Sequence, residues 1–301
     1  MSGGTMSNLI LKEWEVIIMV YKNCCDVDFE LIYQCFNEGF SDYIVKFDLP
    51  LEAFRKSFFG PEGNELKHSF IAIENKRPIG LVLGGIKDYQ GIKTMRCGAF
   101  CIVPDYRGKG IADELFYLHK EKAISEGCSQ MMLENIIGND RALNFYKKHG
   151  YEKVYELQYF RLEDFSKLKG LYNKNGYEIK PIEFSELEKA RDLMGDVHIN
   201  WQNDFTYIEK SEGQYNYGTF ENGRLVGILS INEYGRINLI WVDKKYRGQR
   251  IGSALLSNAI EMLNLTKLGT SFPNNHTLYG FYKKLGFEKE KIAQYEMYLT
   301  L

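Results

Sequence analysis

A short glycine-containing segment, which recurs later in the chain, carries the residue types that could hold a phosphate group. An apolar stretch (94–103) that predicts a strand runs into the first segment, and a predicted helix (108–126) begins inside it. Helix N termini expose unpaired N–H donors and a partial positive charge, which suit a pyrophosphate, and glycines let the backbone approach closely. An ordinary strand-to-helix turn is the alternative interpretation. The segment reads Arg107-Gly108-Lys109-Gly110-Ile111-Ala112.

An asparagine and a tyrosine downstream of this segment could take part in acid catalysis. Asn139 follows a predicted strand (131–136), and Tyr146 lies seven residues later on a predicted helix (140–149). A phenol placed near the sulfur of a thioester can donate a proton to the departing thiolate. The asparagine amide can hold a polar chain or a water in the same cleft. A tyrosine packed in the core is the alternative for Tyr146.

Both segments occur twice, which indicates a tandem duplication. The run 107–112 returns at an offset of 140 (247 − 107), and the run 145–151 returns at an offset of 136 (281 − 145). A third match precedes them, Arg77-Pro78-Ile79-Gly80 against Arg224-Leu225-Val226-Gly227. The second copy of the glycine segment reads Arg247-Gly248-Gln249-Arg250-Ile251-Gly252, and the later motif is repeated by Asn275 and Tyr282.

The repeats divide the chain into two predicted domains. We expect residues 1–13 to be a tag or disordered terminus, residues 14–162 to form an N-terminal unit, and residues 177–301 to form a C-terminal unit. Residues 163–176, which carry lysines, asparagines and two glycines, are typical of a linker. Each unit is expected to end in an aromatic-rich strand. Mixed strands and interleaved helices predict an α/β (mixed α+β) fold with helices flanking each sheet.

Composition excludes several classes of protein. The chain has 301 residues, is 45% hydrophobic and carries a net charge of −2, as expected for a globular protein with a real core. This charge does not favour a nucleic-acid binder, and the longest apolar runs are far shorter than the ~20 residues that span a bilayer. The six cysteines and five histidines form no CxxC pair or cluster, so we predict no metal and no disulfides. A cytoplasmic location is the default expectation.

With both motifs in tandem, the chain resembles the GCN5-related N-acetyltransferase (GNAT) superfamily over about 280 residues. The family's Arg-x-x-Gly-x-Gly/Ala segment matches residues 107–112, and its Asn…Ala…Phe-Tyr-x-x-x-Gly-Phe/Tyr segment matches 139–151. The resemblance implies two tandem GNAT folds, each a mixed and mostly antiparallel sheet, and acetyl-CoA as co-substrate. It further implies that the pyrophosphate lies on residues 107–112, that Phe100, Cys101 and Ile102 pair with the pantetheine arm through their backbones, and that Tyr146 is the general acid.

The two copies differ in residues that matter for catalysis. Glu134 lies where several family members carry a carboxylate that deprotonates the amine, whereas its counterpart is Thr270. An exposed strand residue or a salt-bridge partner is the alternative role for Glu134. Arg250 replaces the second glycine of the turn, and we expect it to adopt helical φ/ψ. The C-terminal copy therefore ranks second, with a cofactor site expected at Val242, Arg247, Gly248, Gln249, Arg250, Ile251, Gly252, Asn275 and Tyr282.

These inferences predict an N-acetyltransferase that moves an acetyl group to a primary amine of a small molecule by direct attack. The sequence leaves open a non-catalytic acyl-CoA-binding scaffold or sensor, and a protein N-terminal or lysine acetyltransferase. The two units are expected to pack against each other as an internal pseudo-dimer, so that the chain is a monomer. No nucleic acid or membrane partner is expected.

Overall fold

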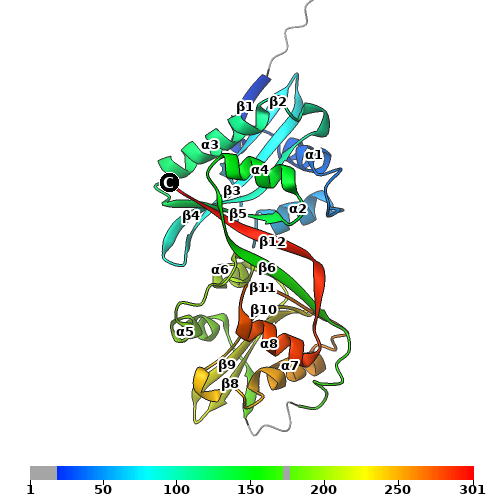
Figure 1. The fold of residues 1–301 in the computed structure, drawn as a ribbon, viewed down its shortest axis with the longest axis vertical. Helices are drawn as coiled ribbons and strands as arrows, with labels where there is room; N and C mark the ends of the chain where they lie inside the picture. The colour runs from blue at the N-terminus through cyan, green and yellow to red at the C-terminus, as the bar shows by residue number, and fades with distance from the viewer. Residues whose placement is uncertain (1–18, 172–176) are drawn as a thin grey trace, which may run out of the picture.

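The computed structural model describes residues 19–171 and 177–301. Within the described residues the strands form one continuous twelve-stranded sheet in the order β1-β2-β3-β4-β5-β12-β6-β11-β10-β9-β8-β7. The terminus expected at residues 1–13 and part of the linker, 172–176, lie outside the described residues. Two lobes, each with helices against its part of the sheet, follow one another along the molecule (Figure 1). No described helix is long and apolar enough to cross a membrane.

The N-terminal unit begins with one strand and two helices, which are followed by three consecutive strands and then by helices that alternate with strands. These elements are β1 (Met19–Asn23), α1 (Phe29–Gly39), α2 (Leu51–Phe58), β2 (Glu65–Glu74), β3 (Arg77–Tyr89), β4 (Ile92–Ile102), α3 (Ile111–Ser125), β5 (Gln130–Ile136), α4 (Asp140–Lys148) and β6 (Glu152–Leu162). Strands β4 and β5 are parallel over residues 94–97 and 130–133. The other pairs between β1 and β4 are antiparallel.

The C-terminal unit repeats this order. Its elements are β7 (Glu178–Pro181), α5 (Phe184–Met194), α6 (Phe205–Lys210), β8 (Gln214–Glu221), β9 (Arg224–Asn232), β10 (Arg236–Val242), α7 (Ile251–Met262), β11 (Leu268–Pro273), α8 (His276–Leu285) and β12 (Glu288–Thr300). Here β10 and β11 are the parallel pair, joined at residues 236–237 and 269–270. The mixed, mostly antiparallel sheet with flanking helices confirms the predicted fold class.

The final strands of the two units are exchanged, which the sequence did not predict. Strand β6 was expected to close the N-terminal unit, but it pairs with β11 of the C-terminal unit, and β12 pairs with β5. The exchanged strands also pair with each other as they cross between the lobes (Figure 1). Because each unit contributes one strand to the other's part of the sheet, the units share a single folded structure.

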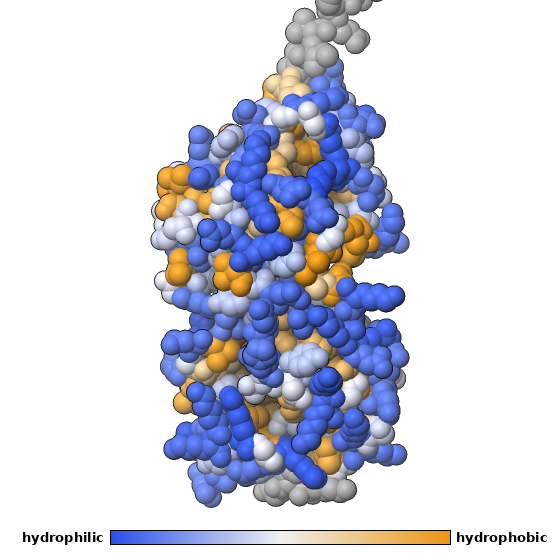
Figure 2. Space-filling view, in the orientation of Figure 1, coloured by the Kyte–Doolittle hydropathy of each residue, from blue (hydrophilic) through white to orange (hydrophobic). Residues whose placement is uncertain are grey.

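The hydrophobic cores follow this exchange. Met297 and Leu299 of β12 are buried in the core beneath α3 and α4 of the N-terminal unit. Phe160 and Leu162 of β6 are buried beneath α7 and α8 of the C-terminal unit. Outside these cores, the face in Figure 2 is mostly hydrophilic, with small and separate hydrophobic patches.

The exchange predicts that a residue near the C terminus stabilises the N-terminal unit. Met297 is fully buried in that unit's core, so Met297→Ala should lower the free energy of unfolding of the whole chain by about 2–5 kcal/mol. Met262→Ala, at an exposed position on α7, is the matched control and should change it by less than about 0.5 kcal/mol. Chemical denaturation measures both, and equal effects would contradict the assignment of β12 to this core.

Candidate active site

The two glycine turns have the same backbone conformation. In the N-terminal unit Gly108 and Gly110 have φ of +76° and +84°, and α3 begins at the next residue. In the C-terminal unit Gly248 has φ of +82° and Arg250 has φ of +65°, directly before α7. Arg250 is therefore left-handed, and the expectation of helical φ/ψ was wrong. The turn requires a positive φ at this position, which costs a non-glycine residue roughly 1–2 kcal/mol.

The arginines that begin the two turns have different partners. In both copies the arginine Nε donates to a strand carbonyl at 3.0 Å, Arg107 to Ile102 and Arg247 to Val242. Arg107 continues with a bidentate ion pair to Asp42, in which Nη2 lies 2.8 Å from Oδ1, and it also donates to the Gly39 carbonyl. Within residues 19–171 and 177–301 no carboxylate pairs with Arg247. Its guanidinium thus remains available to an anionic ligand.

Beyond the N-terminal turn, aromatic side chains of the same unit contact the predicted acid, Tyr146. Phe100 packs against the rings of Phe145 and Tyr146, with centroid distances of 5.6 and 6.4 Å. Tyr146 is buried, and burial, together with the neighbouring Cys97, raises the pKa of its hydroxyl. Asn139 caps α4 by accepting from the Ala142 N–H at 3.3 Å. Phe100, one of the predicted pantetheine-binding residues on β4, thus contacts the ring of the predicted acid.

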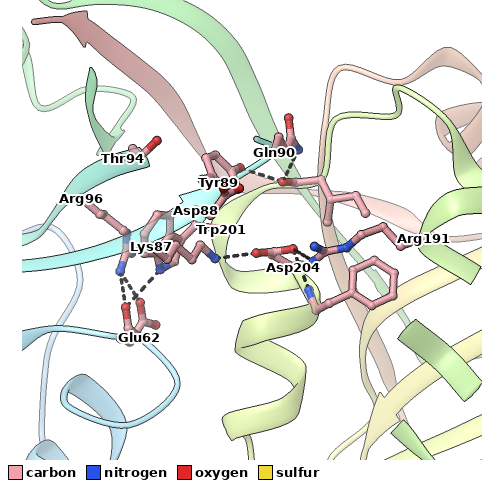
Figure 3. Close-up of polar contacts among 12 residues, drawn as sticks. Glu62, Lys87, Asp88, Tyr89, Gln90, Thr94, Arg96, Arg191, Trp201 and Asp204 are labelled. Carbon is pink, nitrogen blue, oxygen red and sulfur yellow. Dashed lines mark hydrogen bonds and ion pairs between the residues drawn. The ribbon is translucent and has the colours of Figure 1, made fainter. Parts of the chain in front are cut away.

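Glu134 is held in a buried ion-pair chain. Its Oε2 accepts from Arg96 Nε at 2.9 Å, and Arg96 Nη1 donates to Glu62 at 2.7 Å. Burial raises the pKa of Glu134, and Arg96 opposes that shift. Trp201, from the C-terminal unit, donates its indole N–H to the Glu62 carbonyl at 3.1 Å. The salt-bridge role that the sequence left open for Glu134 is therefore present in the structure, and Figure 3 shows Trp201 of the other unit beside Arg96 and Glu62.

A cavity of about 760 Å³ lies in the C-terminal unit, on the copy that the sequence ranked second. It extends along the end of β10, the turn, the N terminus of α7, the end of β11 and one side of α8. Its basic lining residues are Lys167, Lys244, Arg247, Arg250 and Lys284, together with His198. Of the residues predicted for this copy, the lining includes Val242, Arg247, Gly248, Arg250, Ile251, Gly252, Asn275 and Tyr282, but not Gln249, whose amide accepts from Tyr177.

Tyr282 is the counterpart of the predicted general acid in this copy. It lines the cavity with only 1% of its surface exposed, and its hydroxyl shares a hydrogen bond with Thr270. Burial raises the pKa of Tyr282 and the bond to Thr270 opposes that shift. The phenol therefore keeps its proton at neutral pH, as a general acid must. Asn275 caps α8 by accepting from the Leu278 N–H at 3.0 Å, so its carbonyl oxygen is already engaged.

The far wall of the cavity comes from residues that the sequence did not identify. They lie in the loop between α5 and α6 and on β10, and the buried members are Asn200, Asn203 and Asn238. Asn203 Nδ2 donates to Asn200 Oδ1 at 2.8 Å, which fixes the two amides against each other. The only available signal was positional, because this loop lies between the first two helices of its unit, as residues 40–50 do in the N-terminal unit.

Two family models match the chain. One, described as "Acetyltransferase (GNAT) family", matches residues 29–151, and the other, "Acetyltransferase (GNAT) domain", matches residues 197–300. N-alpha-acetyltransferase 30 of Schizosaccharomyces pombe is 33% identical over 92 residues, or 29% of this chain and 61% of the relative. The Saccharomyces cerevisiae protein of that name is 29% identical over 92 residues, 29% of this chain and 52% of the relative. The chain thus spans just over half the length of these relatives.

Solved structures share the whole architecture. A tandem GNAT protein from the clavulanic acid biosynthesis pathway, in its form without acetyl-CoA, has a TM-score of 0.68 at 15% identity and covers 95% of this chain and 98% of its own. A GCN5-related N-acetyltransferase from Sphaerobacter thermophilus has a TM-score of 0.66 at 13% identity and covers 94% and 95%. At these identities the likeness shows the fold alone.

The buried ion-pair chain predicts a pH-dependent effect of removing its cation. Arg96→Met leaves Glu134 buried without its cation, so the free energy of unfolding should fall by about 3–5 kcal/mol at pH 7. The pKa of Glu134, already raised, rises further in the variant, so protonation should restore part of this loss at pH 5. Denaturant unfolding at both pH values measures the effect. Arg161→Met, at the exposed pair with Glu163, is the control and should cost less than about 1 kcal/mol at either pH; an equal cost at both sites would refute the account.

Proposed function

Because this chain belongs to the GNAT family, with two GNAT folds in tandem, we propose that it transfers an acetyl group from acetyl-CoA to a primary amine in the cavity of the C-terminal unit. One observation carries the proposal: the 760 Å³ cavity joins a left-handed glycine turn, the gap where two parallel strands separate, and a buried protonated tyrosine. The corresponding cleft of the N-terminal unit is lined with its own aromatic side chains, and its arginine is paired with Asp42.

The residues of the cavity fit acetyl-CoA as co-substrate. The free N–H groups at the start of α7, with Lys244, Arg247 and Arg250, would hold its pyrophosphate. The edge of β10 that separates from β11 beyond residue 237 would pair with the pantetheine arm. The apolar residues Ile240, Val242 and Phe281 would cover the rest of that arm.

The proposed reaction is direct attack. The neutral amine nitrogen bonds to the thioester carbonyl carbon, and a backbone N–H of β10 stabilises the negative charge that develops on oxygen. The carbon–sulfur bond then breaks, the amine nitrogen loses its proton to solvent, and Tyr282 donates a proton to the departing thiolate. Tyr146 and Glu134, the acid and base that the sequence placed in the N-terminal unit, define the alternative site.

The acceptor is proposed to be the amine of a small molecule, bound between the loop 198–204 and the end of β11. The names of the two yeast relatives favour a second candidate, the α-amino group of a peptide. A panel of small amines and short peptides, each assayed for consumption of acetyl-CoA, distinguishes the two. Binding of acetyl-CoA without turnover of any member would instead support the sensor alternative.

We also propose that the chain works as a monomer, which light scattering tests directly.

Two matched tyrosine variants test which copy is active. Tyr282→Phe should lower kcat by about a hundredfold or more, because the thiolate loses its proton donor. Tyr146→Phe removes the equivalent phenol from the N-terminal unit and should leave kcat within about twofold. Steady-state kinetics on an accepted amine measures both. A large loss in Tyr146→Phe with none in Tyr282→Phe would return the active site to the N-terminal unit.

Two matched arginine variants test where acetyl-CoA binds. Arg247→Ala should weaken binding by roughly ten- to a hundredfold, the worth of hydrogen bonds to a charged group. Arg107→Ala should leave the affinity unchanged, because the Arg107 guanidinium is already engaged by Asp42 and two carbonyls. Calorimetry must use the whole chain, since a chain divided at the linker would strip β12 from the N-terminal unit. Equal weakening by both variants would indicate that both turns bind the ligand.

A further inference from the structure

His198 connects the cavity to the N-terminal unit and to both exchanged strands. It lines the C-terminal cavity, and its ring stacks on Tyr155 of β6 at a centroid distance of 3.8 Å and an interplanar angle of 10°. Nε2 lies 2.6 Å from Oε2 of Glu296 on β12, and Nδ1 lies 3.0 Å from Oε1 of Gln90, at the turn after β3. The ring thus contacts the N-terminal unit and both exchanged strands at once.

Both ring nitrogens of His198 face oxygen atoms. The Gln90 amide cannot be turned to offer its nitrogen instead, because its Nε2 donates to the Ile199 carbonyl at 3.2 Å (Figure 3). Gln90 Oε1 accepts only, so Nδ1 carries a proton. A second proton must lie between Nε2 and the Glu296 carboxylate, since two lone pairs at 2.6 Å would repel. His198 and Glu296 therefore hold two protons between them, one more than a neutral imidazole and a carboxylate would carry together.

The charges behind Glu296 give this carboxylate a reason to pair with a cation. Glu296 is fully buried, and it lies directly opposite Glu134 in the β12–β5 register. Glu134 has Arg96 as its cation, and His198 is the one basic side chain bonded to Glu296 within the described residues. A buried carboxylate without a cation costs several kcal/mol. A doubly protonated His198 supplies the missing positive charge.

The proton matters because His198 begins the loop that forms the far wall of the cavity. The N-terminal unit holds this loop at several points: Tyr89 donates its hydroxyl to the Ile199 carbonyl at 2.7 Å, and Lys87 pairs with Asp204 at 2.7 Å. These contacts and Trp201 are seen together in Figure 3. The His198–Glu296 pair adds an attachment to β12 at the start of the loop. Its loss would free the wall that faces the acceptor, not the turn that faces the pyrophosphate.

We propose that His198 is a positioning residue of the transfer reaction, and that its ring, protonated at both nitrogens and bonded to Glu296, fixes the acceptor-side wall of the cavity. The inference rests on the proposed function. Since the ring already carries both protons, it acts on the acceptor through the loop and does not serve as a base. Loss of the bond between His198 and Glu296 loosens the wall and raises KM for the amine.

The titratable groups around His198 come from four elements. They are Glu296 and Tyr298 on β12, Tyr155 on β6, Tyr89 on β3 and Glu134 on β5, with Arg96 behind Glu134. Burial raises the pKa of Tyr89 and of Tyr298, so both phenols remain neutral across the range in which a histidine titrates.

Nuclear magnetic resonance of the whole chain with ¹⁵N-labelled histidine tests the protonation directly. At pH 7.5 an ordinary histidine is mostly neutral, but His198 should show two protonated ring nitrogens. In Glu296→Gln the glutamine can donate to Nε2, so a neutral ring suffices and one protonated nitrogen is expected. His198→Gln assigns the signal, and Gln90→Met, which should shift Nδ1 alone, serves if either of the others does not fold. A singly protonated His198 in the wild type would overturn the proposal.

The pH dependence of KM separates positioning from a structural role. Over the pH range in which the resonance shows loss of the second proton, KM for the amine should rise at least fivefold in the wild type and stay within twofold in Glu296→Gln. The affinity for acetyl-CoA should remain constant in both. Parallel KM profiles would refute the positioning role. If no amine is acetylated, the proposed function fails, whereas the resonance still tests the proton.

Discussion

The insertion of β12 between β5 and β6 is the constraint on which the rest of the structure depends. A tandem repeat could place its two sheets edge to edge or leave them apart on a linker, but here each unit completes the other. Met297 and Leu299 enter one core, and Phe160 and Leu162 enter the other. Neither unit can move as a rigid body without breaking strand pairs, so the contacts between units are as permanent as those within them.

This constraint also brings one loop of the C-terminal unit against the N-terminal unit. The loop 198–204 reaches the N-terminal unit, where Trp201 and Gln202 bond to Glu62 beside the buried Arg96 and Glu134. The same contacts hold that loop at the edge of the C-terminal cavity. Glu134, which the sequence proposes as a catalytic base, lies in this buried ion-pair chain, and the loop that contacts the chain also lines the cavity of the other repeat.

Much of the fold was predictable because it depends on local sequence patterns. The repeated turns and the order of strands and helices depend on residues close together in the chain. The exchange of β6 and β12 was not predictable, since two strands of similar composition fit either edge. The partner of Glu134 was not predictable either: Arg96 lies 38 residues away, on a neighbouring strand. The backbone conformation of Arg250 was mispredicted because the turn requires a positive φ, which overrides the residue's preference for negative φ.

The central claim is that duplication left one open acetyl-CoA site, in the C-terminal unit, with the N-terminal unit as its support. Crystallographic determination of the whole chain with acetyl-CoA bound tests it most directly. The account predicts ligand density along β10, the 247–252 turn and Tyr282, with Arg107 still paired to Asp42. Density on the 107–112 turn, with the Asp42 pair broken and Phe100 displaced from Tyr146, would contradict it.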